Sequence, residues 1–299
     1  MKDTGAETTR NAFTVDVEEY FQVEAFSGII ERKDWERYPS RIDGQVHRVL
    51  RILDGFDIRG TFFILGWLAE KNPSLVKRIA EAGHEIASHG FDHKMISRMT
   101  PEEFRQDVRR SKAVLEEISG GTVAGYRAPT FSIRENTSWA HEILLHEGYG
   151  YSSSVYPIWH DRYGWPEFGD RPRRIASNGT GDLWEVPLAV RSLGPVKIPF
   201  GGGGYFRSYP LFLTKAFFRD RAARGKASVF YMHPWELDTE LPVVDAPFLT
   251  RTRHYLGIPK AERKLASLLP SLRFGTLAQV LEDLKGAAAT PPRPGKDAA

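Results

Sequence analysis

Cysteine is absent from this sequence, and its absence removes several kinds of chemistry at once. No disulfide can form, no thiolate can act as a nucleophile, and no zinc site can use sulfur ligands. Any metal ion bound by the 299-residue chain must therefore be held by histidine, aspartate or glutamate side chains.

Long apolar runs and blocks of one charge are also missing. No stretch reaches the roughly 18 apolar residues of a membrane span, and the polar start MKDTGAETTRNAF lacks the apolar core of a signal peptide. We therefore expect a cytoplasmic protein with no integral membrane segment. The net charge is only +3, and basic residues gather only in short clusters such as residues 109–110 and 171–174. We therefore expect no nucleic-acid partner.

The composition, 41% hydrophobic and 12% aromatic, is that of a folded domain in which strands and helices alternate. Expected strands lie at residues 12–17, 60–65, 84–88, 123–129 and 227–232, and expected helices at 42–56, 67–82, 137–146 and 211–223. Thr100, Pro101 and Glu103 together predict the capped start of one more helix. This alternation indicates a parallel sheet wrapped by helices, and we expect one irregular α/β barrel.

The alternation of strands and helices stops between about residues 151 and 209, which are rich in Pro, Gly, Trp and Tyr. We predict an irregular loop insertion there, with WEVPLAV as its one clear strand. The tail at 286–299, which is rich in Pro, Gly and Ala, is expected to be disordered. A single catalytic domain then spans residues 1–285.

Ionisable side chains follow four of the expected strands. They are Asp16, Glu18 and Glu19 after the first strand, His89 and His93 after the third, Arg127 after the fourth, and His233 and Glu236 after the last. Active sites of parallel α/β proteins gather beyond the carboxyl ends of the strands. These side chains are therefore expected to meet at one edge of the sheet.

The stretch HEIASHGFDH holds three of the nine histidines. His89 and His93 are four residues apart, so on a helical turn both rings would point the same way and bind one divalent ion. The candidates for a third ligand are Glu18, Glu19 and Asp16. An isolated pair at this spacing is more often structural, but the charged strand ends favour a metal site. We expect His84 to be structural.

Several other side chains admit both a structural and a functional interpretation. Arg127 can clamp a carboxylate for either purpose. A lone buried histidine such as His233 is more often structural, but its place before PWE favours catalysis. The glycines of GGGGYFR form a turn that also permits close approach of a ligand. The candidates for substrate contact are Tyr205, Trp235, which could stack on a sugar ring, and the pair His160 and Asp161.

Taken in order, TVDVEEYF, SHGFDH, GYRAP and FYMHPWE resemble the motifs of the polysaccharide deacetylase family, the NodB-homology carbohydrate esterases. Further stretches, among them TFFILGW, PIWHDRYG and GGGGYFR, resemble the branch that accompanies exopolysaccharide gene clusters of the bacterial exosortase system. The resemblance runs from about residue 11 to 274. It implies a distorted (β/α) barrel of about seven parallel strands that removes N-acetyl groups from sugars.

Carried onto this chain, the resemblance makes Asp16 the catalytic base, Arg127 the residue that orients it, and His233 the acid. A backbone amide near Pro129 and Thr130 would meet the oxyanion. A family aspartate that often follows a later strand would fall at Ser152, so the chain departs from the family there.

The resemblance also implies the metal ligands. His89 and His93 match the metal-binding histidine pair. The family's acidic ligand usually follows the base directly, where this chain has Val17, so Glu18 becomes the ligand candidate and Glu19 its alternative. Zinc is the first expectation for the ion, and nickel, cobalt and iron suit the same donors.

Three functions follow from these features. The first is a metal-dependent deacetylase of an exopolysaccharide or its precursor, with an N-acetylated polysaccharide or oligosaccharide as substrate. The second is a hydrolase of small amides or cyclic imides. The third is a catalytically silent carbohydrate-binding protein.

Overall fold

The computed structural model describes residues 9–160, 162–179, 181–194 and 196–289. Within them one mostly parallel sheet has the strand order β10-β1-β2-β3-β4-β5-β7-β6, with β11 paired to β1. The strands that run parallel from β10 to β7 are β10 (Val229–Met232), β1 (Asn11–Val17), β2 (Thr61–Ile64), β3 (Glu85–Ser88), β4 (Gly125–Tyr126), β5 (Tyr151–Ser152) and β7 (Gly181–Glu185). β6 (Arg173–Asn178) is antiparallel to β7, and β11 (Phe274–Gly275) is parallel to β1. A separate hairpin joins β8 (Val190–Leu193) to β9 (Val196–Pro199).

Helices connect and cover these strands. The α-helices are α1 (Ile42–Gly55), α2 (Gly66–Lys71), α3 (Pro73–Glu81), α4 (Pro101–Ser119), α5 (Trp139–His146), α6 (Gly203–Ser208), α7 (Leu211–Ala223), α8 (Phe248–Tyr255), α9 (Ile258–Leu268) and α10 (Leu277–Ala289). The 3-10 helices are η1 (Glu24–Phe26), η2 (Arg32–Arg37), η3 (Ile96–Arg98), η4 (Pro129–Phe131), η5 (Glu135–Thr137), η6 (Pro166–Phe168), η7 (Pro234–Leu237) and η8 (Leu269–Ser271). The predicted cap of α4 is present, because Thr100 and Glu103 exchange both bonds of a capping box.

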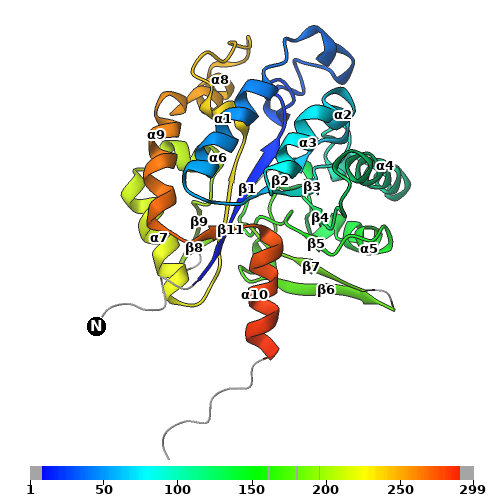
Figure 1. Cartoon of the computed structure of the whole chain (residues 1–299), viewed down its shortest axis with the longest axis vertical. Helices are drawn as coiled ribbons and strands as arrows, with labels where there is room; N and C mark the ends of the chain where they lie inside the picture. The colour runs from blue at the N-terminus through cyan, green and yellow to red at the C-terminus, as the bar shows by residue number, and fades with distance from the viewer. Residues whose placement is uncertain (1–8, 161, 180, 195, 290–299) are drawn as a thin grey trace, which may run out of the picture.

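The two faces of the sheet have different partners. Alternate side chains of β1, such as Phe13 and Val15, join the main core under α1, α3 and α4. Ala12, which faces the opposite side of the sheet, belongs to a second core that includes Leu277 of α10. Figure 1 shows α10 in red below the strands, opposite α1 to α4. On this second face Asp16 lies at the carboxyl end of β1 and is 1% exposed, so the sheet carries the site at its rim.

The predicted barrel is confirmed only as a mostly parallel α/β sheet. Among the described residues no pairing joins β10 to β6, so the row of strands stays open. An isolated parallel bridge between Gly202 and Tyr231 adds backbone on the outer side of β10 without completing a ring.

Three predicted segments differ from the structure. The helix expected at 67–82 is divided into α2 and α3, because Pro73 opens a new helix and cannot continue the old one. The segment 151–209 holds strands β5 to β9 and α6 rather than an irregular loop. Of the predicted strand WEVPLAV, only the first two residues belong to β7, which ends at Glu185. The helix α10 continues to Ala289, which is four residues into the tail predicted to be disordered.

No helix within the described ranges combines the length and apolar character that a bilayer span requires. The cytoplasmic location and the single domain over residues 1–285 stay predictions from the sequence.

Candidate active site

The rim of the sheet brings together ionisable side chains that are far apart in the sequence. Asp16 and Glu18 lie at the end of β1, His89 follows β3, Arg127 follows β4, and His233 follows β10. All five strands involved, β2 included, are parallel neighbours, so their carboxyl ends share one edge. The expected meeting of these side chains is therefore what the structure shows.

Glu18, His89 and His93 form a buried group that can hold a metal ion. One donor atom from each lies within 4.8 Å of the other two. Nδ1 of His89 is 2.9 Å from the backbone oxygen of Arg127, a contact that fixes the N–H on Nδ1 and leaves the lone pair of Nε2 for an ion. Two histidines and one carboxylate are a donor set that zinc and related ions accept.

The local contacts of Glu18 fit a bound cation. Its Oε2 lies 2.7 Å from Nε2 of His93, yet within the described chain that buried oxygen accepts no hydrogen bond of acceptable geometry. A buried carboxylate oxygen without a directed donor is costly. Glu18 and neutral His93 would each offer a lone pair to a divalent ion, which would satisfy this oxygen.

Burial and charge prepare these ligands for a metal. Burial by itself raises the pKa of Glu18, but the charges of His93 and His233 outweigh it and lower that pKa to about 2. Burial lowers the pKa of His89 to about 4. At neutral pH the carboxylate is therefore ionised and the His89 ring is neutral, and both states are the ones that bind metal.

The two histidines reach the site without the helical turn that we predicted. Residues 89–95 are not helical, and the chain bends at Gly90 (φ +75°) and at His93 (φ +53°). The bend is held from α4, where Oδ2 of Asp107 accepts the amide N–H of Phe91 at 2.9 Å. The spacing in the sequence thus identified the pair, although the backbone between them has another shape.

The acidic candidates have separate places. Glu18 joins the histidines, whereas the backbone N–H of Arg41 donates to Oε2 of Glu19 at 3.2 Å, which directs Glu19 toward the start of α1. Burial raises the pKa of Glu19. The structure therefore groups Glu18, and not Glu19, with His89 and His93.

Arg127 holds Asp16 from beneath. Its guanidinium is completely buried and donates from Nη1 to Oδ1 of Asp16 at 2.6 Å and to the hydroxyl of Thr14 at 2.8 Å. Ser153 accepts from the other two nitrogens through its backbone and side-chain oxygens. The planar fork is thus fixed on several sides, and the orientation of the Asp16 carboxylate is fixed with it.

His233 lies on the other side of Glu18. Its Nε2 is 3.5 Å from Oε1 of Glu18, and its Nδ1 is 2.7 Å from Oε1 of Glu236. The ring stacks on Trp235, with centroids 4.9 Å apart and planes 16° from parallel. Burial lowers the pKa of His233, but the charge of Glu18 and the contact with Glu236 outweigh burial and raise that pKa to about 9.

Ser152, which stands where the family often has an aspartate, makes no contact with His233 among the described interactions. Its hydroxyl donates to Ser154 at 2.7 Å, within a buried chain of serines beside Arg127. The carboxylate that contacts His233 comes instead from Glu236, three residues further along the chain. Glu236 was noted in the sequence for its place after a strand but was not predicted as a site residue. The local spacing HPWE, which puts an acid one turn after the histidine, was the available signal.

A cleft of about 620 Å³ opens over this group. Of the predicted substrate contacts, Thr130, Tyr205, His160 and Trp235 line it. Pro129 is buried outside its lining, and Asp161 falls outside the described residues. Thr130 (φ +56°) and Phe131 (φ +50°) both hold the left-handed backbone that such residues rarely adopt. Strain of this kind gathers at functional sites.

A family model matches the part of the chain that holds His89, His93 and Arg127. Residues 38–146 match the sequence model of the polysaccharide deacetylase family, and residues 153–282 match a domain of unknown function, DUF3473. A peptidoglycan-N-acetylglucosamine deacetylase of Bacillus cereus is 34% identical over 96 residues, which are 32% of this chain. The match spans 35% of that relative, about a third of its length.

Solved structures share the fold over most of the chain. A Mycobacterium smegmatis protein proposed to be a polysaccharide deacetylase superposes with a TM-score of 0.61 at 21% identity, covering 98% of this chain and 96% of the other. An allantoinase, Puue, gives the same TM-score at 17% identity, covering 96% and 93%. Both matches show that the chain shares its α/β fold with these two proteins.

Proposed function

From the support that these matches give to the polysaccharide deacetylase family, we propose that the chain is a metal-dependent hydrolase that removes N-acetyl groups from a glycan. The observation that carries the proposal is the buried group of Glu18, His89 and His93 between an oriented carboxylate and a charged imidazole. A metal site with a base on one side and an acid on the other suits the hydrolysis of an amide.

The three ligands would be Glu18, His89 and His93, and the donor set fits a divalent ion such as zinc. When bound, such an ion supplies Lewis-acid polarisation of a carbonyl and lowers the pKa of water. Side chains of this protein would carry out the proton transfers.

Asp16 is the proposed base. One of its oxygens is held by Arg127 at 2.6 Å, so the other can accept the proton of an attacking water. Arg127 is not placed to touch substrate, because it is completely buried under Asp16. Its part is to aim the carboxylate.

His233 is the proposed acid. An amide nitrogen leaves only when it is protonated, and His233 carries a proton at neutral pH because its pKa is raised to about 9. Glu236 accepts from Nδ1, so Nε2, which faces Glu18 and the cleft, is the atom that delivers the proton. The backbone near Pro129 and Thr130 would meet the oxyanion, and the strained Thr130 lines the cleft where that charge develops.

We further propose an N-acetylated exopolysaccharide or its precursor as the substrate. The motifs shared with the exopolysaccharide-associated branch support this choice. Aromatic residues along the cleft, among them Tyr205 and Trp235, also suit a sugar, because aromatic faces pack on its apolar C–H surface.

The test is acetate release from N-acetylated oligosaccharides by the purified full-length chain supplied with zinc. We expect turnover in the wild type and in His47→Ala, which removes an exposed histidine of α1. Asp16→Asn and His89→Ala should each lose at least about 100-fold in kcat/KM. Acetate release by His89→Ala at the wild-type rate would refute the metal-dependent route. Hydrolysis of small cyclic imides with no acetate released from any glycan would refute the proposal that the substrate is an N-acetylated glycan.

A further inference from the structure

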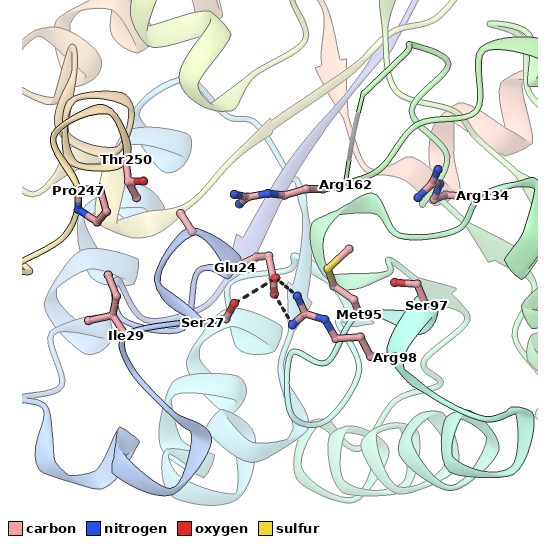
Figure 2. Close-up of a pocket in the computed structure, with 12 residues that line it drawn as sticks. Glu24, Ser27, Ile29, Met95, Ser97, Arg98, Arg134, Arg162, Pro247 and Thr250 are labelled. Atoms are coloured by element: carbon pink, nitrogen blue, oxygen red, sulfur yellow. Dashed lines mark hydrogen bonds and ion pairs between the residues drawn. The ribbon is translucent and has the colours of Figure 1, made fainter.

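A second hollow of about 480 Å³ adjoins the cleft and is rich in arginine. We name it the arginine pocket, after Arg98, Arg134 and Arg162 in its lining. Figure 2 shows the three guanidinium groups around one opening, with Glu24 and Met95 between them. They come from three separate segments, the end of η3, the residue before η5, and the chain after β5.

The charges of this pocket are not balanced within the described residues. Arg98 is neutralised, because its Nη2 lies 2.6 Å from Oε1 of Glu24. Glu24 is the one carboxylate among the described lining residues. Across the described chain neither Arg134 nor Arg162 has a carboxylate within ion-pair distance. Within the described part of the chain, these two positive charges therefore line the concave surface with no carboxylate paired to them.

The backbone N–H of each of the two arginines makes a local hydrogen bond. The amide N–H of Arg134 donates to the hydroxyl of Thr137 at 2.8 Å, which fixes the residue at the start of η5. The amide N–H of Arg162 donates to Nδ1 of His160 at 3.2 Å, and the His160 ring stacks on Tyr163 at 3.8 Å. Their side chains are exposed or half-exposed, so a ligand can reach both guanidinium groups.

The arginine pocket continues directly into the cleft. Glu24, Ala25, Arg162 and Thr250 line both hollows. A glycan whose N-acetyl group lies at Glu18, His89 and His93 can therefore extend past Arg162. Its next unit would enter the arginine pocket.

Resting on the proposed function, we infer that the substrate is an anionic glycan whose negative group binds in the arginine pocket, where Arg134 and Arg162 supply positive charge. Guanidinium groups bind carboxylate and phosphate oxygens through charge-assisted, often paired hydrogen bonds. A neutral sugar offers no charge-assisted hydrogen bond to either guanidinium group. The pocket thus selects a charged unit next to the N-acetyl sugar that is hydrolysed.

Two sources can supply this anionic chemistry. One is the carboxylate of a uronic acid next to the N-acetyl sugar in a polymer. The other is the diphosphate that joins a sugar to its carrier in a precursor. Both present oxygens that accept hydrogen bonds from a guanidinium group, and ligands of each type distinguish them.

The experiment measures dissociation constants by calorimetry for the full-length chain at fixed ionic strength. The ligands are a neutral tetrasaccharide of N-acetylglucosamine, a tetrasaccharide of alternating N-acetylglucosamine and glucuronate, and uridine diphosphate N-acetylglucosamine. The variant is Arg134→Gln/Arg162→Gln. Its matched control, Arg51→Gln/Arg219→Gln, removes two exposed charges from α1 and α7, outside both hollows.

We expect one charged ligand to bind about tenfold more tightly than the neutral tetrasaccharide, with the preference lost in Arg134→Gln/Arg162→Gln and kept in the control. Preference for the glucuronate ligand identifies a uronic acid as the source, and preference for the nucleotide sugar identifies a diphosphate. Equal affinity for all three ligands would overturn the inference. So would an equal loss in the control, because the effect would then come from net charge.

The binding measurements and the acetate-release assay can fail independently of each other. If no glycan releases acetate but the charged ligand binds as described, the arginine pocket stands and the hydrolase proposal fails. If acetate is released equally well from neutral and charged glycans, and both bind alike, the hydrolase stands and the pocket inference fails.

Discussion

Glu236 determines the direction in which His233 can deliver a proton. Its carboxylate lies 2.7 Å from Nδ1, which leaves Nε2 toward Glu18 and the cleft. The same carboxylate lies 3.3 Å from Nε of Arg207, so it is held from behind. Because Glu236 acts through His233, it is a positioning residue, and its loss should affect the chemistry more than the metal.

The variant Glu236→Gln tests this role with little change of shape. We expect kcat to fall by about 10- to 100-fold, because the imidazolium loses its charged partner. The metal content should stay that of the wild type, since none of the three ligands is changed. Loss of metal together with activity would contradict a role confined to His233.

The sequence alone could not decide whether Glu18 or Glu19 is the metal ligand. Both follow β1, and their neighbouring positions made both candidates. The chain turns immediately after Val17, so the alternation of the strand no longer determines which side chain faces the site. Tertiary contacts separate the two, because Glu18 lies against His93 whereas Glu19 accepts from the backbone of Arg41.

At the scale of elements, α4 supports the bend that carries the metal-binding histidines. Asp107 on α4 is the acceptor for the amide of Phe91, between His89 and His93. A Cβ added at Gly90 would lie 2.9 Å from Oδ2 of the same Asp107. The bend therefore depends on both a carboxylate and a glycine.

We expect Asp107→Ala to weaken metal binding by up to about tenfold and to lower the free energy of unfolding by about 1–3 kcal/mol. Both effects follow because the partly buried amide of Phe91 loses its acceptor and the bend is held less firmly. Metal titration and urea unfolding would measure them. Asp107→Asn, which keeps an acceptor oxygen, should restore most of both, and equal damage in the two variants would show that the hydrogen bond is not the cause.

Elements with strong local signals were predicted well from the sequence. The capping box at Thr100 predicted the start of α4, and the short β-branched stretch of residues 12–17 predicted β1. Residues 151–209 were not resolved into their strands, because β8 and β9 pair only with each other and β6 is largely exposed. Such strands have no continuous apolar face from which a sequence pattern could predict them. Their partners are set by tertiary contacts.

At the scale of the whole molecule, the parallel sheet gathers one site from strands distributed over the chain. The order of strand ends predicted which residues meet. It could not predict whether the sheet closes, because closure depends on how its outermost strands meet. It also gave no sign of the arginine pocket, since Arg98, Arg134 and Arg162 come from unrelated segments.

Folding also buries histidines in neutral form, which makes stability depend on pH. Burial lowers the pKa of His84 to about 4 from an ordinary 6.5, and Nδ1 of His84 accepts the amide N–H of Gly60. Between these pH values the unfolded chain binds a proton that the folded chain does not. Stability should therefore fall as the pH drops from 6.5 to 4. The lowered pKa values of His89 and His254 act in the same direction.

Replacement of His84 isolates its share of this dependence. In His84→Gln the slope of unfolding free energy against pH should be smaller by up to about one proton between pH 4 and 6.5. Urea unfolding over that range gives the slope. His47→Gln, which changes an exposed histidine, should keep the wild-type slope. An unchanged slope in His84→Gln would show that His84 is not a neutral buried group.

The metal content of the purified chain tests the central claim most directly. After incubation with zinc or cobalt, we expect about one divalent ion per chain in the wild type and in the control His47→Ala/His146→Ala. The variant His89→Ala/His93→Ala should bind none. A wild-type chain that holds no ion, or a double variant that holds as much as the wild type, would contradict the site formed by Glu18, His89 and His93.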